Sequence, residues 1–224
     1  MRIQYLGHSA FLIVTGQHSL LFDPFITGNP SASKKPEEIK ATHIFVSHAH
    51  GDHLGDTVKI AKSNNSKVYT TFELARMLDK EPIKFFPGNI GGIQKTEFGS
   101  VKLVAAVHGS GVPGGIACGF VVEAENVKVY FAGDTALTTD MSLLADEGIT
   151  LALLPIGGLY TMGPEDAVRA VKMIKPDFVI PMHYDTFPAI SQDPAKFKSQ
   201  VESQTNTKVI LLKPDEIFEL PIEG

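Results

Sequence analysis

Apolar residues occur along this chain mainly in short runs, separated by Gly, Pro, Asn or charged residues. In the first part of the chain, runs of strand length predict strands at residues 3–7, 11–15, 19–23, 43–47, 67–71, 84–87, 92–98, 101–108, 119–124 and 127–134. Helical spacing of apolar residues occurs in the same part at 56–63 and 72–80. This part is therefore predicted to be rich in strands.

In the remaining part of the chain, helical spacing of apolar residues alternates with apolar runs of strand length. Helices are predicted at residues 141–148, 164–175 and 194–204. Strands are predicted at the apolar runs 150–156, 177–183 and 208–214. Strands followed by alternating helices and strands predict an α/β fold, in which two sheets pack together with helices on the outside. Since no clear linker or low-complexity tract interrupts the chain, we expect residues 1–224 to form a single domain.

Composition narrows the classes of function. The formal net charge of −5 disfavours nucleic-acid binding, which depends on a basic surface that displaces counterions. Cys118 is the one cysteine, so no internal disulfide can form, and its apolar neighbours are typical of a buried strand. No secretory signal is evident, and no apolar stretch reaches the ~18 residues that cross a bilayer. We therefore expect a cytoplasmic protein that acts on a small molecule and associates with neither nucleic acid nor membrane.

The sequence HAHGDH, which begins at His48, places three histidines and an aspartate directly after a predicted strand. In near-extended backbone, residues two apart point to the same side, so His48 and His50 can bind one ion together. Gly51 permits an unusual backbone conformation, which turns Asp52 and His53 toward a neighbouring position. Histidine and carboxylate ligands without cysteine suit Zn²⁺, and also Mn²⁺ or Fe²⁺.

Three further residues that can bind metals end predicted strands, namely His108, Asp134 and His183. The carboxyl ends of strands can gather along one edge of the sheet core, where α/β folds tend to place their sites. We therefore expect these side chains to lie near the histidine loop, so that four strands contribute to one metal site.

The loop pattern H-x-H-x-D-H, followed in order by His108, by Asp134 within FAGDT and by His183, resembles the metallo-β-lactamase superfamily. The resemblance covers nearly the whole chain. It implies a four-layer αβ/βα sandwich, with two mixed β-sheets flanked by helices and the site at one edge between the sheets. It also implies two groups of metal ligands bridged by Asp134: His48, His50 and His108 for one ion, and Asp52, His53 and His183 for the other.

Within that superfamily, the stretches YLGHSAFLI, LLFDPFITGNP and LLPIGGLYTMGPEDA are most similar to a compact branch of uncharacterised metal-dependent hydrolases, itself similar to the L-ascorbate 6-phosphate lactonases. We expect two divalent metal ions per chain, zinc in the first place, with manganese, iron or nickel as alternatives. A shared water with a lowered pKa would supply a hydroxide that attacks a small ester, lactone or phosphoester. Asp52 and Asp134 would orient this nucleophile or transfer its proton. The oligomeric state stays open, a homo-oligomer included.

Three features have more than one interpretation. His8 follows a predicted strand in a GHS turn, and either binds substrate or donates a proton as a third catalytic residue, or supports a ligand from the turn. Asp23 either orients a ligand histidine or forms a turn. The loop 157–162 either borders the substrate or only leads into the following helix. His18 and His43 are expected outside the site.

The sequence leaves two other functions on the same fold open. A di-iron redox protein is the first, although such relatives usually carry a flavin domain and replace a loop histidine by a carboxylate. A non-catalytic metal-binding protein is the second, although no ligand of the pattern is missing. A nuclease is disfavoured by charge and length, and β-lactam hydrolysis by the lack of an export signal.

Overall fold

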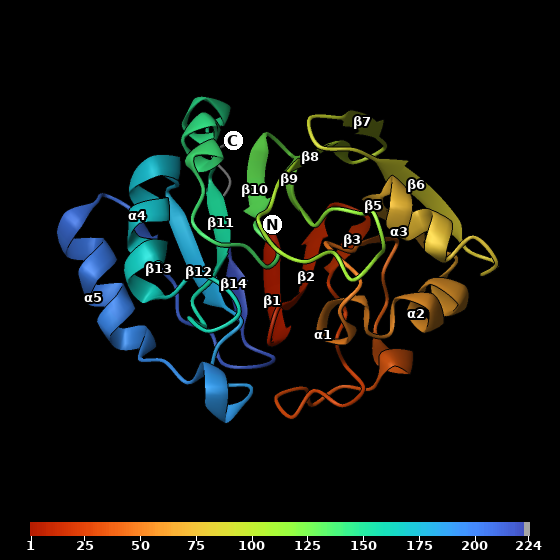
Figure 1. Ribbon diagram of the computed structural model, residues 1–224, viewed down its shortest axis with the longest axis horizontal. Coiled ribbons are helices and arrows are strands. Elements are labelled where there is room, and N and C mark those ends of the chain that lie inside the picture. Colours follow the sequence, from red (N-terminus) through yellow and green to blue (C-terminus); the bar gives the residue numbers. More distant parts are fainter. Residues whose placement is uncertain (222–224) are drawn as a thin grey trace.

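The computed structural model describes residues 1–221, which contain two seven-stranded sheets (Figure 1). The strands of the first sheet are β1 (Arg2–Gly7), β2 (Ala10–Thr15), β3 (His18–Phe22), β4 (His43–Phe45), β5 (Lys67–Thr71), β6 (Lys84–Gly88) and β14 (Ile217–Glu219). Those of the second sheet are β7 (Ile93–Thr96), β8 (Gly99–Ala105), β9 (Cys118–Ala124), β10 (Val127–Phe131), β11 (Leu151–Pro155), β12 (Phe178–Met182) and β13 (Lys208–Val209).

Each sheet combines parallel and antiparallel strands. The first has the order β14-β1-β2-β3-β4-β5-β6, antiparallel from β14 to β3 and parallel from β3 to β6. The second has the order β13-β12-β11-β10-β9-β8-β7, parallel from β13 to β10 and antiparallel from β10 to β7. The predicted pair of mixed sheets is therefore confirmed.

Helices flank both sheets (Figure 1). The α-helices are α1 (Gly51–Leu54), α2 (Thr57–Asn64) and α3 (Phe72–Met77) beside the first sheet, and α4 (Pro164–Ile174) and α5 (Pro194–Gln204) beside the second. Short 3₁₀ helices are η1 (Pro36–Glu38), η2 (Thr139–Glu147) and η3 (Pro188–Ile190). Within residues 1–221, no helix combines the length and the apolar character needed to cross a membrane.

Aromatic side chains join the two sheets at the centre of the molecule. Phe22 of the first sheet stacks on Phe45 with ring centroids 4.6 Å apart, and lies 5.1 Å from Phe131 of the second sheet. Phe45 also meets Phe120 edge to face at 5.5 Å. All four rings are buried, so the sheets share one apolar core between them. A smaller buried cluster, which includes Ile60 of α2, lies on the outer side of the first sheet.

The structure differs from the predicted elements mainly near the end of the chain. The apolar run 208–214 predicts one strand, but β13 covers only Lys208–Val209. Pro214 cannot donate a ladder hydrogen bond and restricts the residue before it, so a strand could not reach the end of the predicted run. The chain instead crosses to the first sheet, where β14 pairs with β1. The predicted helix 141–148 is a 3₁₀ helix, which Thr138 caps and Gly148 ends in a left-handed conformation.

His43, at the start of β4, is expected to make the stability of the protein depend on pH. Its side chain is buried, Nδ1 lies 2.8 Å from the Thr42 hydroxyl, and burial lowers the pKa of His43 to about 4. As pH falls from about 6.5 toward 4, the unfolded histidine binds a proton that the folded one does not. The free energy of unfolding should therefore fall over this range, and a His43→Gln variant should lose that part of the decrease.

Urea unfolding at pH values from 7.5 to 4.5, for wild type and variant at the same metal concentration, measures this difference. His18→Gln is the matched control, because the His18 ring lies 5.6 Å from the His43 ring but is partly exposed. Stability curves for wild type and His43→Gln that run parallel through the whole range would contradict the prediction.

Candidate metal centre

The histidine loop leaves the first sheet after β4 and turns into α1. His50 has extended backbone (φ −63°, ψ 147°), and its carbonyl accepts a hydrogen bond from the amide of His53 at 3.0 Å. The single helical turn that follows separates the pair His48 and His50 from the pair Asp52 and His53. Gly55 ends this turn at φ 41°, where a Cβ would lie 2.4 Å from a backbone oxygen of the loop after β3. Only glycine fits there without strain.

Three histidines form the first group of candidate ligands. The Nε2 atom of His48 lies 3.0 Å from Nδ1 of His50, and Nε2 of His108 lies 3.3 Å from the same atom. Their rings stand nearly perpendicular to one another, with interplanar angles of 79–82°. Nitrogen ligands at 2.0–2.1 Å in tetrahedral geometry lie about 3.3–3.4 Å apart, so this spacing suits one ion such as Zn²⁺.

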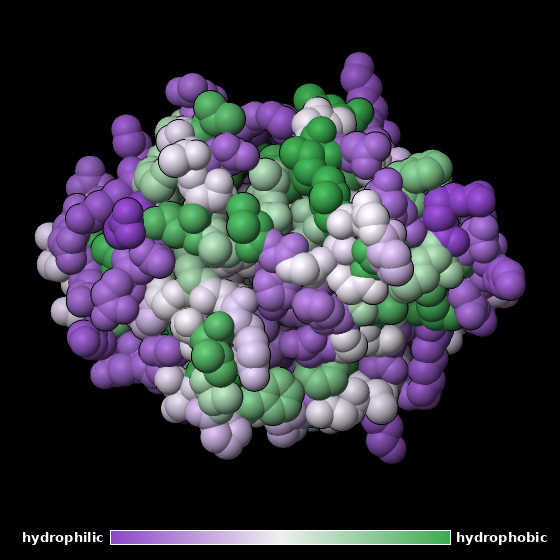
Figure 2. All heavy atoms as spheres, viewed as in Figure 1, coloured by the Kyte–Doolittle hydropathy of each residue, from purple (hydrophilic) through white to green (hydrophobic). Residues whose placement is uncertain are grey.

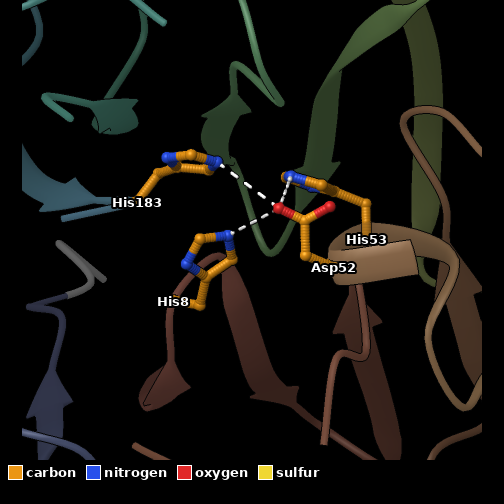
Figure 3. A group of neighbouring side chains, drawn as sticks. All are labelled: His8, Asp52, His53 and His183. Carbon is orange, nitrogen blue, oxygen red and sulfur yellow. Dashed lines mark hydrogen bonds and ion pairs between the residues drawn. The ribbon is translucent and has the colours of Figure 1, made fainter. Parts of the chain in front are cut away.

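The second group gathers around Asp52 (Figure 3). Its Oδ2 atom lies 3.1 Å from Nε2 of His8, 3.7 Å from Nε2 of His53 and 3.8 Å from Nε2 of His183. These residues come from the ends of β1 and β12 and from α1, so the structure brings together three segments that lie far apart in the sequence.

Asp134 lies between the two groups. Its Oδ1 atom is 3.3 Å from Nε2 of His53, and its Oδ2 atom is 3.1 Å from Nε2 of His183 and 3.5 Å from Nε2 of His108. His108 belongs to the first group and the other two histidines to the second. One carboxylate therefore contacts both groups.

The centre is open to solvent on one side only. The side chain of Asp52 is 32% exposed and that of His108 is 15% exposed, and His50 is also exposed. By contrast, the side chains of His8 and His53 are fully buried. A reactant must therefore approach from the side of Asp52, His50 and His108.

Carboxylates and imidazoles in the centre shift one another's pKa values. Burial alone would raise the pKa of Asp134, but His53 and His183 hold that pKa well below its ordinary value. Asp52 behaves in the same way, because contacts with His183 and His8 outweigh its burial and lower its pKa. Conversely, burial opposes a charge on His183, but the Asp134 and Asp52 carboxylates raise its pKa to about 9. Both carboxylates are therefore ionised, as metal ligands must be.

Burial keeps two other histidines of the centre, His48 and His8, neutral. Burial is the main cause that lowers the pKa of His48 to about 2, and the neighbouring His53 adds to the shift. Burial likewise lowers the pKa of His8 to about 4, against the opposing effect of Asp52. A neutral imidazole offers one nitrogen lone pair, which is the form that binds a metal ion.

Unpaired polar atoms at the centre fit a metal ion. Among the described residues, the buried atoms His53 Nε2, Asp134 Oδ1 and His183 Nε2 have no hydrogen-bond partner, although each lies within 4 Å of another ligand atom. An unpaired buried polar group is costly, and coordination of a cation would satisfy all three atoms. The donor set of histidine nitrogens and carboxylate oxygens is that of Zn²⁺, Mn²⁺ and Fe²⁺ sites.

Asp23 orients one histidine of each group from behind. It is fully buried and accepts hydrogen bonds from Nδ1 of His53 at 2.7 Å and from the Ser47 hydroxyl at 2.5 Å. Because that hydroxyl donates to Asp23, it accepts from Nδ1 of His48 at 2.9 Å. Both histidines are thereby held through Nδ1, so that Nε2 of each ring faces the centre. Of the two interpretations of Asp23, the structure favours the orienting one.

Replacing this carboxylate should weaken metal binding. An asparagine side chain would keep one acceptor oxygen but lose the charge and the second acceptor, so an Asp23→Asn variant should bind zinc about 10- to 100-fold more weakly. Competition with a chromophoric chelator measures the affinity. Asp56→Asn is the matched control, because Asp56 accepts hydrogen bonds from Thr27 and contacts no ligand histidine. Equal affinities for Asp23→Asn and wild type would contradict the assigned role.

The structure adds residues around His8 that the sequence did not indicate. Thr186 places its hydroxyl oxygen 2.9 Å from Nδ1 of His8, across 178 positions of the chain. The ring of Phe187 meets that of His8 edge to face at 5.7 Å, as does the ring of Phe25. The only signal in the sequence is that Thr186 and Phe187 follow closely after His183.

Three residues singled out from the sequence lie apart from the ligand cluster. His18 and His43 start β3 and β4, at the opposite end of the first sheet, as expected. Cys118 lies at the start of β9 with its thiol 3.5 Å from the carbonyl oxygen of Ser47. Burial raises the pKa of the Cys118 thiol well above its ordinary value, so this side chain is an inert core group rather than a nucleophile.

Comparisons with known proteins agree with this fold. Residues 2–183 match the family model described as a Beta-lactamase superfamily domain. The chain is 47% identical to a UPF0173 metal-dependent hydrolase of Symbiobacterium thermophilum, over 98% of this chain and 100% of that one. It is 46% identical to another UPF0173 metal-dependent hydrolase, from Pelotomaculum thermopropionicum, with the same coverage of both chains.

A solved structure gives the same result. Igni18, a metallo hydrolase from the hyperthermophilic archaeon Ignicoccus hospitalis, superimposes with a TM-score of 0.92 at 35% sequence identity, over 98% of this chain and 99% of that chain. Together with the fold and the ligand cluster, these matches show that the chain belongs to the metallo-β-lactamase superfamily and, within it, to the UPF0173 metal-dependent hydrolases.

Proposed function

We propose that the protein hydrolyses a small ester, lactone or phosphoester at a centre of two divalent metal ions, with zinc as the first candidate and manganese, iron or nickel as alternatives. The observation that carries this proposal is the position of Asp134, whose carboxylate contacts histidines of both ligand groups. His48, His50 and His108 would hold one ion. Asp52, His53 and His183 would hold the other, with Asp134 between them.

The bound ions would polarise an oxygen of the substrate and lower the pKa of water toward 7. The side chains around them have separate tasks. Asp52 is ionised and partly exposed, so it can orient an attacking water and accept its proton. Asp134 is ionised and almost fully buried, which suits a fixed ligand better than a proton carrier. No serine or cysteine nucleophile is needed for this chemistry.

We assign His8 a positioning role through Asp52. A carboxylate only accepts hydrogen bonds, so Nε2 of His8 donates to Oδ2 of Asp52 at 3.1 Å. Nδ1 then accepts from the Thr186 hydroxyl at 2.9 Å, which fixes this tautomer. The side chain of His8 is fully buried, whereas the open side of the centre lies at Asp52. Both facts favour support of Asp52 over direct contact with substrate.

Metal content and hydrolysis, measured on the same preparations, test the proposal. Wild type, Asp52→Ala, His183→Ala and the control His18→Ala would be compared by elemental analysis and on a panel of lactones, carboxylic esters, a phosphomonoester and a phosphodiester. We expect about two ions per wild-type chain and a hydrolytic activity that both centre variants lose and His18→Ala keeps.

Two outcomes would replace the proposal. Two redox-active irons without any hydrolysis would favour the di-iron redox protein. Bound metal without turnover of any substrate class or redox change would favour a non-catalytic metal-binding protein. The absence of bound metal after addition of zinc or manganese would remove the basis of all three functions.

A further inference from the structure

Two apolar side chains project from a short loop beside the metal centre. Leu159 and Tyr160, in the loop after β11, are each 62% exposed. They stand at the tip of a tight loop that the amide of Gly158 closes by donating to the carbonyl of Met162 at 3.2 Å. Because they stand beside the candidate metal centre on a loop of fixed geometry, these two side chains offer a surface for an apolar group of a bound molecule.

The base of this loop is fixed against the metal centre. Gly157 packs on His183, and a Cβ at that position would lie 2.4 Å from the His183 carbonyl oxygen and 3.1 Å from its Nδ1. The side chain of Gln192 donates to the Gly157 carbonyl at 2.9 Å, which ties the loop to the segment after β12. The amide of Met162 donates to the carbonyl of Thr135, the residue after Asp134, at 3.0 Å. The tip is therefore held at a fixed distance from the ligands.

Further apolar side chains border the same centre. Phe187 is 38% exposed, with its ring 5.7 Å from that of His8. Val107, directly before His108, is 57% exposed. Figure 2 shows hydrophilic atoms in the middle of this face and a group of apolar ones below and to the left of them, over the ends of the loops after β11 and β12.

Basic side chains are missing from the segments that border the centre. Within residues 1–221, six segments around the ligands contain no lysine or arginine: 8–9, 46–56, 106–117, 132–138, 156–163 and 183–193. The remaining adjoining segment, 23–42 after β3, carries Lys34, Lys35 and Lys40, and Nζ of Lys34 donates to the side chain of Gln4 on β1 at 3.0 Å. Phosphoryl groups are usually held by arginine forks or lysines in addition to metal ions. The six segments that adjoin the ligands directly offer neither.

We infer that the substrate is an uncharged carboxylic ester or lactone whose apolar acyl or alkyl group lies against Leu159, Tyr160 and Phe187, rather than a phosphoester. The inference rests on the proposed function, since it names the substrate class of the same centre. Each methylene group that leaves water for this apolar surface should strengthen binding about fourfold. A longer acyl chain should therefore be preferred until it extends past the tip of the loop.

Binding of two hydroxamates to the metal-loaded protein tests the inference without any turnover. Acetohydroxamate and octanohydroxamate present the same metal-binding group and differ only in chain length. By calorimetry, octanohydroxamate should bind wild type at least about 10-fold more tightly. The double variant Leu159→Ser with Tyr160→Ser should lose most of this difference. The matched control is Ile93→Ser with Leu143→Ser, which replaces two side chains that are 65% and 68% exposed on β7 and η2.

Hydrolysis separates the failure of this inference from the failure of the proposed function. Esters of p-nitrophenol with acetate, butyrate and octanoate would be compared with p-nitrophenyl phosphate and bis-p-nitrophenyl phosphate. A higher kcat/KM for either phosphate than for every ester would overturn the inference and leave the hydrolase intact. Equal binding of both hydroxamates would also overturn it. If no compound were hydrolysed but octanohydroxamate still bound more tightly than acetohydroxamate, the proposed hydrolase function would fail. The apolar binding surface would then stand without it.

A further outcome concerns contacts between copies of the chain. Sedimentation of the Leu159→Ser, Tyr160→Ser variant should match that of wild type. A smaller assembly for the variant, with unchanged discrimination between the hydroxamates, would overturn the inference and assign these side chains to a subunit interface.

Discussion

Replacement of Asp134 by asparagine is expected to lower kcat/KM by at least ~1,000-fold and to reduce the metal bound per chain. Asparagine has the same shape but carries no charge. The carboxylate of Asp134 contacts His53, His183 and His108, so its loss affects both ligand groups at once. A metal ion contributes several kcal/mol to transition-state stabilisation, and each ~1.4 kcal/mol corresponds to a factor of about ten in rate.

Elemental analysis and steady-state kinetics on the same samples would measure both effects. Asp140→Asn is the matched control, since Asp140 lies in η2 only six positions later but is exposed and outside the ligand cluster. A variant at Asp134 that retained wild-type metal content and activity would show that the carboxylate does not bridge the two groups. In that case the two-ion proposal would lose its main support.

Replacement of Gly133 by alanine is expected to cost about 2–5 kcal/mol in the free energy of unfolding. Gly133 has φ 60°, a left-handed conformation that costs alanine about 1–2 kcal/mol. In addition, the new Cβ would lie 2.8 Å from Cβ of Ser47 and 2.9 Å from the carbonyl oxygen of Cys118. Overpacking of this kind typically costs about 1–3 kcal/mol. The Ser47 side chain links Asp23 to His48, so metal affinity should fall as well.

Gly148→Ala provides the control that separates backbone strain from steric conflict. Gly148 has φ 69°, but a Cβ there would meet no heavy atom within 4 Å. This variant should lose only the backbone contribution, about 1–2 kcal/mol, and keep its metal affinity. Urea unfolding with and without saturating zinc would measure both variants. Equal losses for the two would mean that the segment around Ser47 moves aside at no cost.

The proximity of the candidate ligands is the feature of this protein that the sequence predicts best. Asp52 and His53 follow two histidines in one short loop, and the later candidates follow predicted strands, so one rule about strand ends was enough to bring them together. The structure does place them together, although β8 and β10 end earlier than expected. His108 and Asp134 each lie three residues beyond their strand, at positions reached through loops. Spacing along a strand could not have given these distances.

The neighbours of His8 could not be predicted from the sequence, because they depend on tertiary contacts. Thr186 and Phe187 meet His8 only when the ends of β1 and β12, which belong to different sheets, come together. No periodicity in either segment encodes that contact. The last strand, β14, was missed for a similar reason: its three residues form no apolar run, and only pairing with β1 makes them a strand.

That pairing has a consequence for the order in which the molecule is completed. Arg2 lies opposite Glu219, so β1 gains its outer neighbour only from β14, which is synthesised after all the other strands within residues 1–221. Until then, the edge of β1 has unpaired backbone groups that can join another chain. His8 directly follows β1, so the second ligand group reaches its final arrangement only after β14 has been synthesised and paired with β1. Nascent and truncated chains should therefore aggregate through β1, and capture of metal should be among the last steps of folding.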